Sequence, residues 1–106
     1  MKLFGSAPRS KILTLVALLG ETYPRELARL SNAPLPSVQR MVNALEREGV
    51  VVSRIVGANR EVRLNPRFYG AEELRSLLLK YAKRDSGLEQ RVSELRRRPR
   101  RAGKAL

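Results

Sequence analysis

Arginine, asparagine, glutamine and serine side chains recur along one side of residues 34–48. When this segment is projected as a helix, at about 100° per residue, Val38, Val42 and Leu45 share an apolar sector, and the polar residues lie opposite it or at its margins. In the major groove of DNA, arginine can pair with guanine, and asparagine or glutamine with adenine, through two parallel hydrogen bonds. The segment therefore predicts a helix that reads double-stranded DNA. Its candidate base-contacting residues are Pro36, Ser37, Gln39, Arg40, Asn43 and Arg47.

A β-hairpin is expected directly after this helix, which Gly49 would end. Residues 50–56 are rich in β-branched side chains, residues 61–64 alternate polar with apolar, and residues 57–60 between them are turn formers, with Arg60 at the tip. Cations on this hairpin, which we call the wing (residues 50–64), can bind phosphates or enter the minor groove. The candidate DNA-binding residues of the wing are Arg54, Asn59, Arg60 and Arg63.

The elements that must hold these residues are mainly helical. Residues 10–19 are apolar almost all round a helix, as a central buried helix requires, and Ser10 would cap it and Gly20 would stop it. A short second helix begins at Pro24, and residues 31–34 turn the chain before the polar-faced helix begins. The predicted fold class is mostly α with a small β-hairpin (α+β), in the order helix, helix, helix, hairpin, helix, with a C-terminal helical extension.

The fourth helix is expected at about residues 70–84. Apolar residues recur every seven positions from Leu74 to Leu95, a spacing that favours pairing with a second copy of the chain. Packing inside one subunit would explain the same side chains. Asp85, Ser86 and Gly87 interrupt the pattern and leave open whether one helix or two follow. The candidate dimer-interface residues are Leu74, Leu77, Leu78 and Tyr81.

Two parts of the chain are distinguished by composition. We expect residues 1–84 to form the DNA-binding domain, with its dimerisation helix at about 70–84, and residues 85–106 to form a basic extension that is helical to about residue 95. From Arg96 to Lys104 there is no apolar face, which predicts a flexible tail that adds sequence-independent affinity by releasing counterions from phosphates. A solubilising end without a partner is the alternative.

The charge of the chain points to a polyanionic partner. Its 106 residues, enough for one compact domain, include 22 Lys and Arg against 10 Asp and Glu, a formal net charge of +12. Cations outside the polar-faced helix and the wing are candidates for contacts with flanking phosphates. These cations are Lys2, Arg9, Lys11, Arg25 and Arg29.

The absence of cysteine and histidine excludes disulfides, a Cys/His zinc site and a Cys or His nucleophile, so we expect no metal and no cofactor. There is no glycine-rich phosphate loop and no recognisable motif of paired carboxylates, so we expect no enzyme. No apolar run reaches the roughly 18 residues that a bilayer span needs. The expected location is the cytoplasm, in association with the nucleoid.

The order of these elements resembles the winged helix-turn-helix transcriptional regulators of the ArsR/MarR kind, and four short strings carry the likeness. The strings are residues 3–6 with Arg9 and residues 12–13, residues 25–29, residues 37–40 with residues 45–50, and residues 60–65. The resemblance spans roughly residues 3–82 and implies the fold, DNA binding and a dimer formed through the terminal helix. A two-fold dimer would hold two recognition helices about 34 Å apart and would require a pseudo-palindromic site. We therefore expect a dimeric regulator of the repressor type.

Two features depart from that pattern. Many ArsR-like regulators sense metals through cysteine and histidine, which are missing here, so metal sensing is not implied. Pro34 and Pro36 stand where such regulators more often carry a hydroxyl N-cap. The chief alternative is a winged-helix module that binds RNA or a protein partner within a larger nucleic-acid machine. The major groove of A-form RNA is too narrow for side chains to read, which favours DNA.

Overall fold

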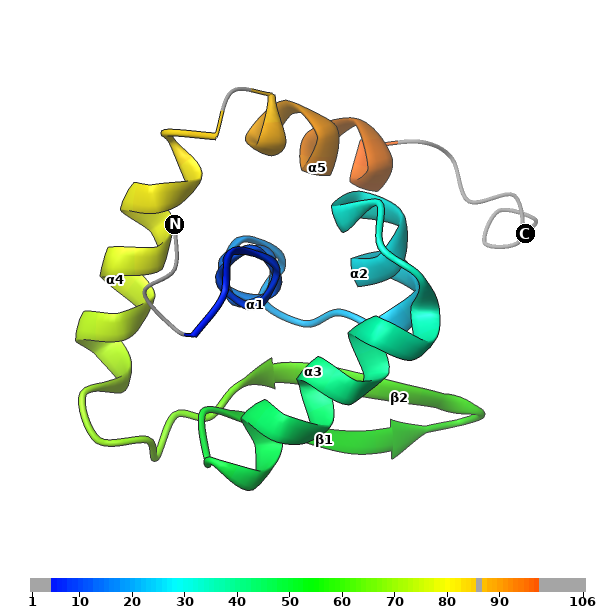
Figure 1. Ribbon diagram of the computed structural model, residues 1–106, viewed down its shortest axis with the longest axis vertical. Coiled ribbons are helices and arrows are strands. Elements are labelled where there is room, and N and C mark those ends of the chain that lie inside the picture. Colours follow the sequence, from blue (N-terminus) through cyan, green and yellow to red (C-terminus); the bar gives the residue numbers. More distant parts are fainter. Residues whose placement is uncertain (1–4, 86, 98–106) are drawn as a thin grey trace.

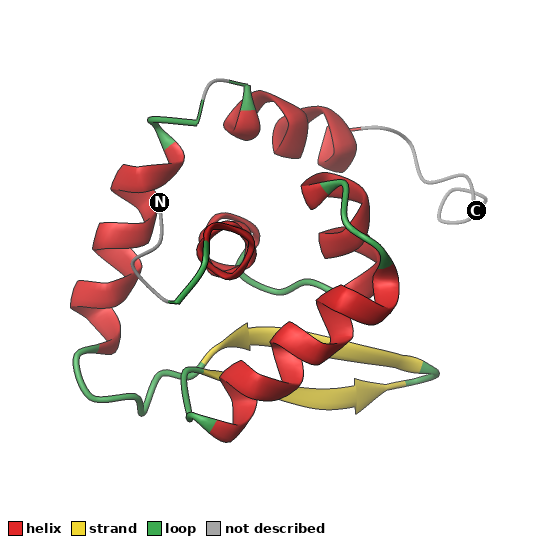
Figure 2. Ribbon diagram, viewed as in Figure 1, coloured by secondary structure: helices red, strands yellow, loops and turns green. Residues whose placement is uncertain are grey.

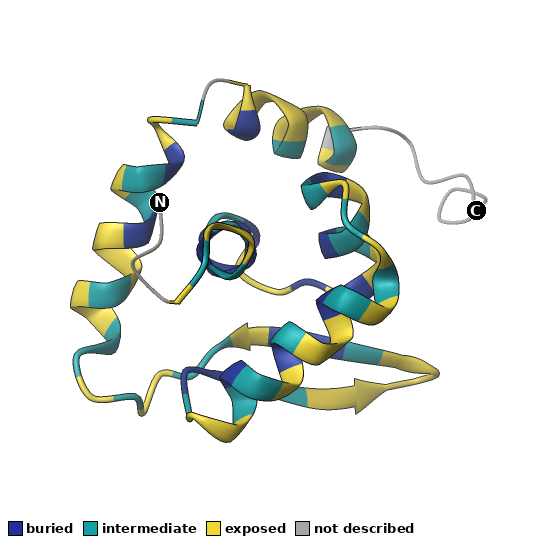
Figure 3. Ribbon diagram, in the orientation of Figure 1, coloured by how far each residue is buried: buried dark blue, intermediate teal, exposed yellow. Residues whose placement is uncertain are grey.

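Helix α1 (Ala7–Leu19) is the central element of the computed structural model, which describes residues 5–85 and 87–97 (Figure 1). It is viewed end-on in the middle of the fold, and most of its surface is buried (Figure 3). The sequence prediction that Ser10 caps this helix was wrong. The N-cap is Ser6, whose hydroxyl accepts from the Arg9 amide at 3.2 Å, and Ser10 is buried one turn further on. Gly20 ends the helix at φ 80°, as predicted.

Helices α2 (Pro24–Ser31) and α3 (Leu35–Arg47) form the helix-turn-helix. Asn32, at φ 61°, turns the chain between them in the left-handed conformation that asparagine tolerates. Pro34 caps α3 without a side-chain hydrogen bond, as the missing hydroxyl predicts. At the other end, Gly49 at φ 81° closes the helix, because its amide donates to the Glu46 carbonyl and the Val50 amide donates to the Leu45 carbonyl.

The wing is an antiparallel pair of strands, β1 (Val51–Val56) and β2 (Asn59–Leu64), with a two-residue turn at residues 57–58 (Figure 2). Gly57, at φ 65°, supplies the positive φ that the first turn position of a tight hairpin requires. The predicted four-residue turn was therefore too long. Arg60 lies within β2, opposite Ile55, and does not form the tip. Thr22 extends the sheet by one bridge, because its backbone exchanges hydrogen bonds with Val62 at 2.9 and 2.7 Å.

Helices α4 (Ala71–Ala82) and α5 (Leu88–Arg97) complete the described chain, so the C-terminal pattern forms two helices and not one rod. Helix α4 packs against α1 through Leu78 and Ala82, both of which are buried. Helix α5 runs from the end of α4 towards α2, across the top of the view in Figure 1, and its first residue, Leu88, is 1% exposed within the core.

Two arginines of α5 tie it to the helix-turn-helix. Arg91 donates to the Leu30 carbonyl at the end of α2, and Arg96 donates to the Glu26 carboxylate at 3.0 Å. The prediction that the flexible tail begins at Arg96 was therefore wrong, since this residue is helical and hydrogen-bonded. The rest of the predicted tail, residues 98–104, lies outside the described residues. Within the described parts, no helix has the length and apolar character that crossing a membrane requires.

Candidate nucleic-acid interface

The apolar face of α3 packs into the core, as predicted, because Val38, Val42 and Leu45 are all buried. The residues predicted to contact bases therefore share the outward side of one helix. Five of the six are exposed, and Ser37 is half-buried, with its hydroxyl accepting from Arg40 Nη2 at 3.3 Å. The exposed ones are Pro36, Gln39, Arg40, Asn43 and Arg47.

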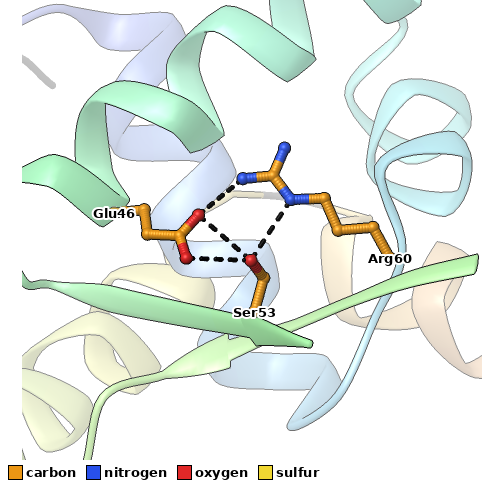
Figure 4. A network of polar contacts seen from close by, with 3 residues as sticks. All are labelled: Glu46, Ser53 and Arg60. Carbon is orange, nitrogen blue, oxygen red and sulfur yellow. Dashed lines mark hydrogen bonds and ion pairs between the residues drawn. The ribbon is translucent and has the colours of Figure 1, made fainter. Parts of the chain in front are cut away.

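Helix α3 contains one carboxylate, Glu46, and this group is turned towards the wing. Its Oε1 accepts from Arg60 Nη2 at 2.6 Å, and both of its oxygens lie 3.0 Å from the Ser53 hydroxyl (Figure 4). Because the negative charge is neutralised at the side of the helix, the outward face bears two arginines, Arg40 and Arg47, and no acid. A face of this kind suits an anionic groove.

The four predicted wing residues do not share one environment. Arg54 pairs with Glu61 on the neighbouring strand at 2.9 Å, although its side chain is 64% exposed. Arg60 is held by Glu46, whereas Asn59 and Arg63 are exposed, and Arg63 has no ion pair among the described residues. Sequence reasoning missed that the outer end of the wing is apolar, with Ile55 72% exposed.

The predicted flanking cations also divide into two groups. Arg9 pairs with Glu48 at 3.3 Å and Lys11 lies 3.9 Å from Asp85, so both have intramolecular partners. Arg25 and Arg29 are exposed on α2 and have no ion pair within the described parts of the chain. Lys2 lies outside the described residues. Arg25 and Arg29 are therefore the flanking cations whose charge is available to a phosphate.

The predicted dimer residues of α4 face two ways. Leu78 is enclosed by the core of its own chain, and Leu74 is half-buried against the same core. Leu77 is 39% exposed, and Tyr81 is half-buried. Leu77 thus presents apolar surface to the solvent, and Leu78 does not.

Comparisons with known proteins agree with this arrangement. Residues 3–54, a little under half of the chain, match the model of the IclR helix-turn-helix domain. The structure is similar to that of a MarR family transcriptional regulator from Silicibacter pomeroyi, at 22% identity and a TM-score of 0.58, over 80% of this chain and 57% of that one. It is also similar to the adhesin competence repressor of Streptococcus pyogenes (13% identity, TM-score 0.62, covering 83% and 65%) and to a variant of MarR from E. coli (18%, 0.60, 84% and 64%). A comparison with curated protein sequences gave no match.

The chain spans between 57% and 65% of the lengths of these three structures. The described residues form five helices and a two-stranded hairpin, and this is the fold that the chain shares with them. The predicted fold class and the predicted resemblance to MarR-like proteins are therefore confirmed. The sequence match to a helix-turn-helix domain agrees with the fold. The fold is therefore that of the winged helix-turn-helix proteins, and residues 3–54 carry the sequence match to a helix-turn-helix domain.

Proposed function

We propose that this chain binds double-stranded DNA in a sequence-specific manner and regulates transcription, with α3 in the major groove. One observation carries the proposal: α3 presents Arg40, Asn43 and Arg47 on its outward side, and its single carboxylate is neutralised at the wing. An α-helix fits the major groove, where these side-chain types can pair with base edges. Selection of bound duplexes from a random pool tests the proposal. An enriched motif supports it, and a pool that stays random contradicts it.

The contacts of the wing are part of the same proposal. Arg63, Arg54 and Asn59 are exposed on the two strands, and we assign to them the phosphate or minor-groove contacts beside α3. On α2, Arg25 and Arg29 are assigned to flanking phosphates. A DNA-binding role also implies a cytoplasmic location at the nucleoid.

The rival function is binding to RNA or to a protein partner. The outward face of α3 favours DNA, because side chains cannot enter the narrow major groove of A-form RNA. Competition between duplex DNA and duplex RNA of equal length separates the two. Equal competition by RNA would favour the rival.

We further propose a dimer formed through α4, and a regulator of the repressor type, as one of the similar structures, the adhesin competence repressor, is a repressor by name. Leu77, which is exposed and lies on the helix that the resemblance assigns to dimerisation, is the test residue. Leu77→Glu is expected to convert the dimer to a monomer in sedimentation at micromolar concentration, because an ionised carboxylate is costly to bury at an interface. The neighbouring exposed residue supplies the control, Ser76→Glu, which is expected to leave the dimer intact. A wild-type chain that sediments as a strict monomer would remove the dimer from the proposal.

Deletion of residues 98–106 tests the contribution of the basic C-terminus. This segment holds Arg98, Arg100, Arg101 and Lys104 and no acid, and the deletion leaves α5 and its contacts with α2 in place. We expect weaker binding to all duplexes alike, and a plot of log affinity against log salt that flattens by about 0.9 for each phosphate that the shortened chain no longer neutralises. Binding titrations at several salt concentrations measure both. A selective loss of affinity for the preferred sequence would contradict this role.

A further inference from the structure

A polar network joins the recognition helix to the wing. Its three members come from three elements: Glu46 from α3, Ser53 from β1 and Arg60 from β2 (Figure 4). The Arg60 guanidinium donates from Nη2 to Glu46 at 2.6 Å and from Nε to the Ser53 hydroxyl at 3.3 Å. The Ser53 hydroxyl in turn donates to the Glu46 carboxylate at 3.0 Å. Each residue therefore contacts both of the others.

The outer half of the wing makes few buried contacts with the rest of the domain. Val51 and Val62 are buried near its base, whereas residues 54–59 are all exposed. In the described parts of the chain, every side-chain hydrogen bond between α3 and the two strands passes through Glu46. Besides the backbone bridge between Thr22 and Val62, this one carboxylate therefore supplies the side-chain link between α3 and the wing.

The ion pair with Glu46 engages Arg60, the wing arginine that the sequence predicted to contact DNA. Arg60 is 25% exposed and Glu46 is 39% exposed, and their charges offset each other. An ion pair with this much exposure stabilises a fold only weakly. The hydrogen bond between Arg60 and Glu46 is charge-assisted, and the Ser53 hydroxyl bonds to both side chains. Such bonds have a preferred geometry, so they can fix the orientation of the wing relative to α3.

We propose that Glu46, Ser53 and Arg60 are positioning residues, which hold the wing at a fixed angle to α3 so that both elements reach the same duplex. The inference rests on the proposed DNA-binding function. It assigns to Arg60 an indirect role, because the wing loses less conformational entropy on binding when its angle is already fixed. Arg63 then carries the phosphate contact of β2.

Glu46→Gln separates the two roles of Arg60 by the sign of its effect. If Arg60 contacts DNA directly, this variant frees the arginine and removes a negative charge near a polyanion, so the affinity rises. If the network positions the wing, the same variant weakens binding to a selected duplex by about tenfold, although it removes a negative charge. Glu72→Gln removes an exposed carboxylate on α4 and is the charge-matched control, with an affinity expected to be unchanged or slightly raised.

Arg60→Ala and the double variant complete the cycle. We expect Arg60→Ala to weaken binding to a similar degree, and the double variant to be no weaker than the worse single variant, because both remove the same contact. Hydroxyl-radical footprints of the variants should lose the protection by the wing and keep that by α3. Additive losses, or a tighter complex for Glu46→Gln, overturn the inference.

A measurement without DNA keeps this test separate from the proposed function. The chain has no cysteine, so Ala58→Cys in the wing turn and Lys80→Cys on α4 give two unique sites for nitroxide labels. In a sample diluted with unlabelled chain, so that a dimer holds at most one labelled subunit, double electron–electron resonance should show one narrow distance distribution for the otherwise unchanged chain and a broader one with Glu46→Gln or Arg60→Ala. Unchanged distributions overturn the positioning role even if DNA binding stands. If the chain binds no duplex, only the proposed function fails, and the distributions still decide whether the network holds the wing.

Discussion

Replacing Leu88 with alanine is expected to lower the free energy of unfolding by about 2–5 kcal/mol. Leu88 is the first residue of α5, it is 1% exposed, and it lies in the same apolar cluster as the core residues of α1 and α4. Alanine at this position would leave a cavity that the flanking helices, each anchored by its own packing, can close only in part. Urea denaturation followed by far-UV circular dichroism measures the change.

The control is Ser93→Ala, an exposed position on the same helix, where a change within about 0.5 kcal/mol is expected. Together the two variants decide whether α5 is part of the folded domain or an appended segment. A loss at Leu88 no larger than that at Ser93 would show that α5 contributes nothing to stability, and would return the domain boundary to residue 84.

The place of α5 could not be predicted from its own pattern. Leu88 and Leu95 continue a seven-residue spacing that begins on α4, which favours one long pairing helix. The contacts that turn α5 back are remote in sequence, because Arg91 and Arg96 bind to α2 across more than sixty residues. Ser86 and Gly87 indicate that the helix is interrupted, but an interruption does not predict where the following helix packs.

The charged residues of β1 and β2 indicate the register in which the two strands pair. A two-residue turn at residues 57–58 sets Arg54 opposite Glu61, and opposite charges on facing strands stabilise that register. The four-residue turn inferred from composition lacks this pairing and moves Arg60 to the tip. The partner of Arg60 was harder to foresee, since Glu46 lies on a different element whose orientation depends on the whole core.

Helix α3 was predicted most fully, and the reason is physical. Its apolar residues recur at helical spacing, its end is marked by a glycine that must adopt a positive φ, and both signals are local. The outward face follows from the buried one, so Arg40, Asn43 and Arg47 could be assigned before any tertiary contact was known.

Arg40→Ala is expected to relax the preference for one base pair by about 1–3 kcal/mol while leaving the others intact. Arg40 is exposed at the centre of the outward face, and its one hydrogen bond there, to Ser37, is long at 3.3 Å and is easily exchanged for a base edge. Competition between a selected duplex and its single-base-pair variants measures the preference at each position.

The matched variant, Arg40→Lys, separates charge from geometry. Lysine keeps the cation but lacks the planar pair of donors that meets two acceptors on guanine at once. If Arg40 reads a base, Arg40→Lys should keep the salt dependence of binding and still lose most of the discrimination at that one position. If Arg40 binds a phosphate, lysine should restore binding to every sequence, and Arg40→Ala should weaken all duplexes equally and reduce the salt slope by about 1. The second pattern would leave base reading to Asn43 and Gln39.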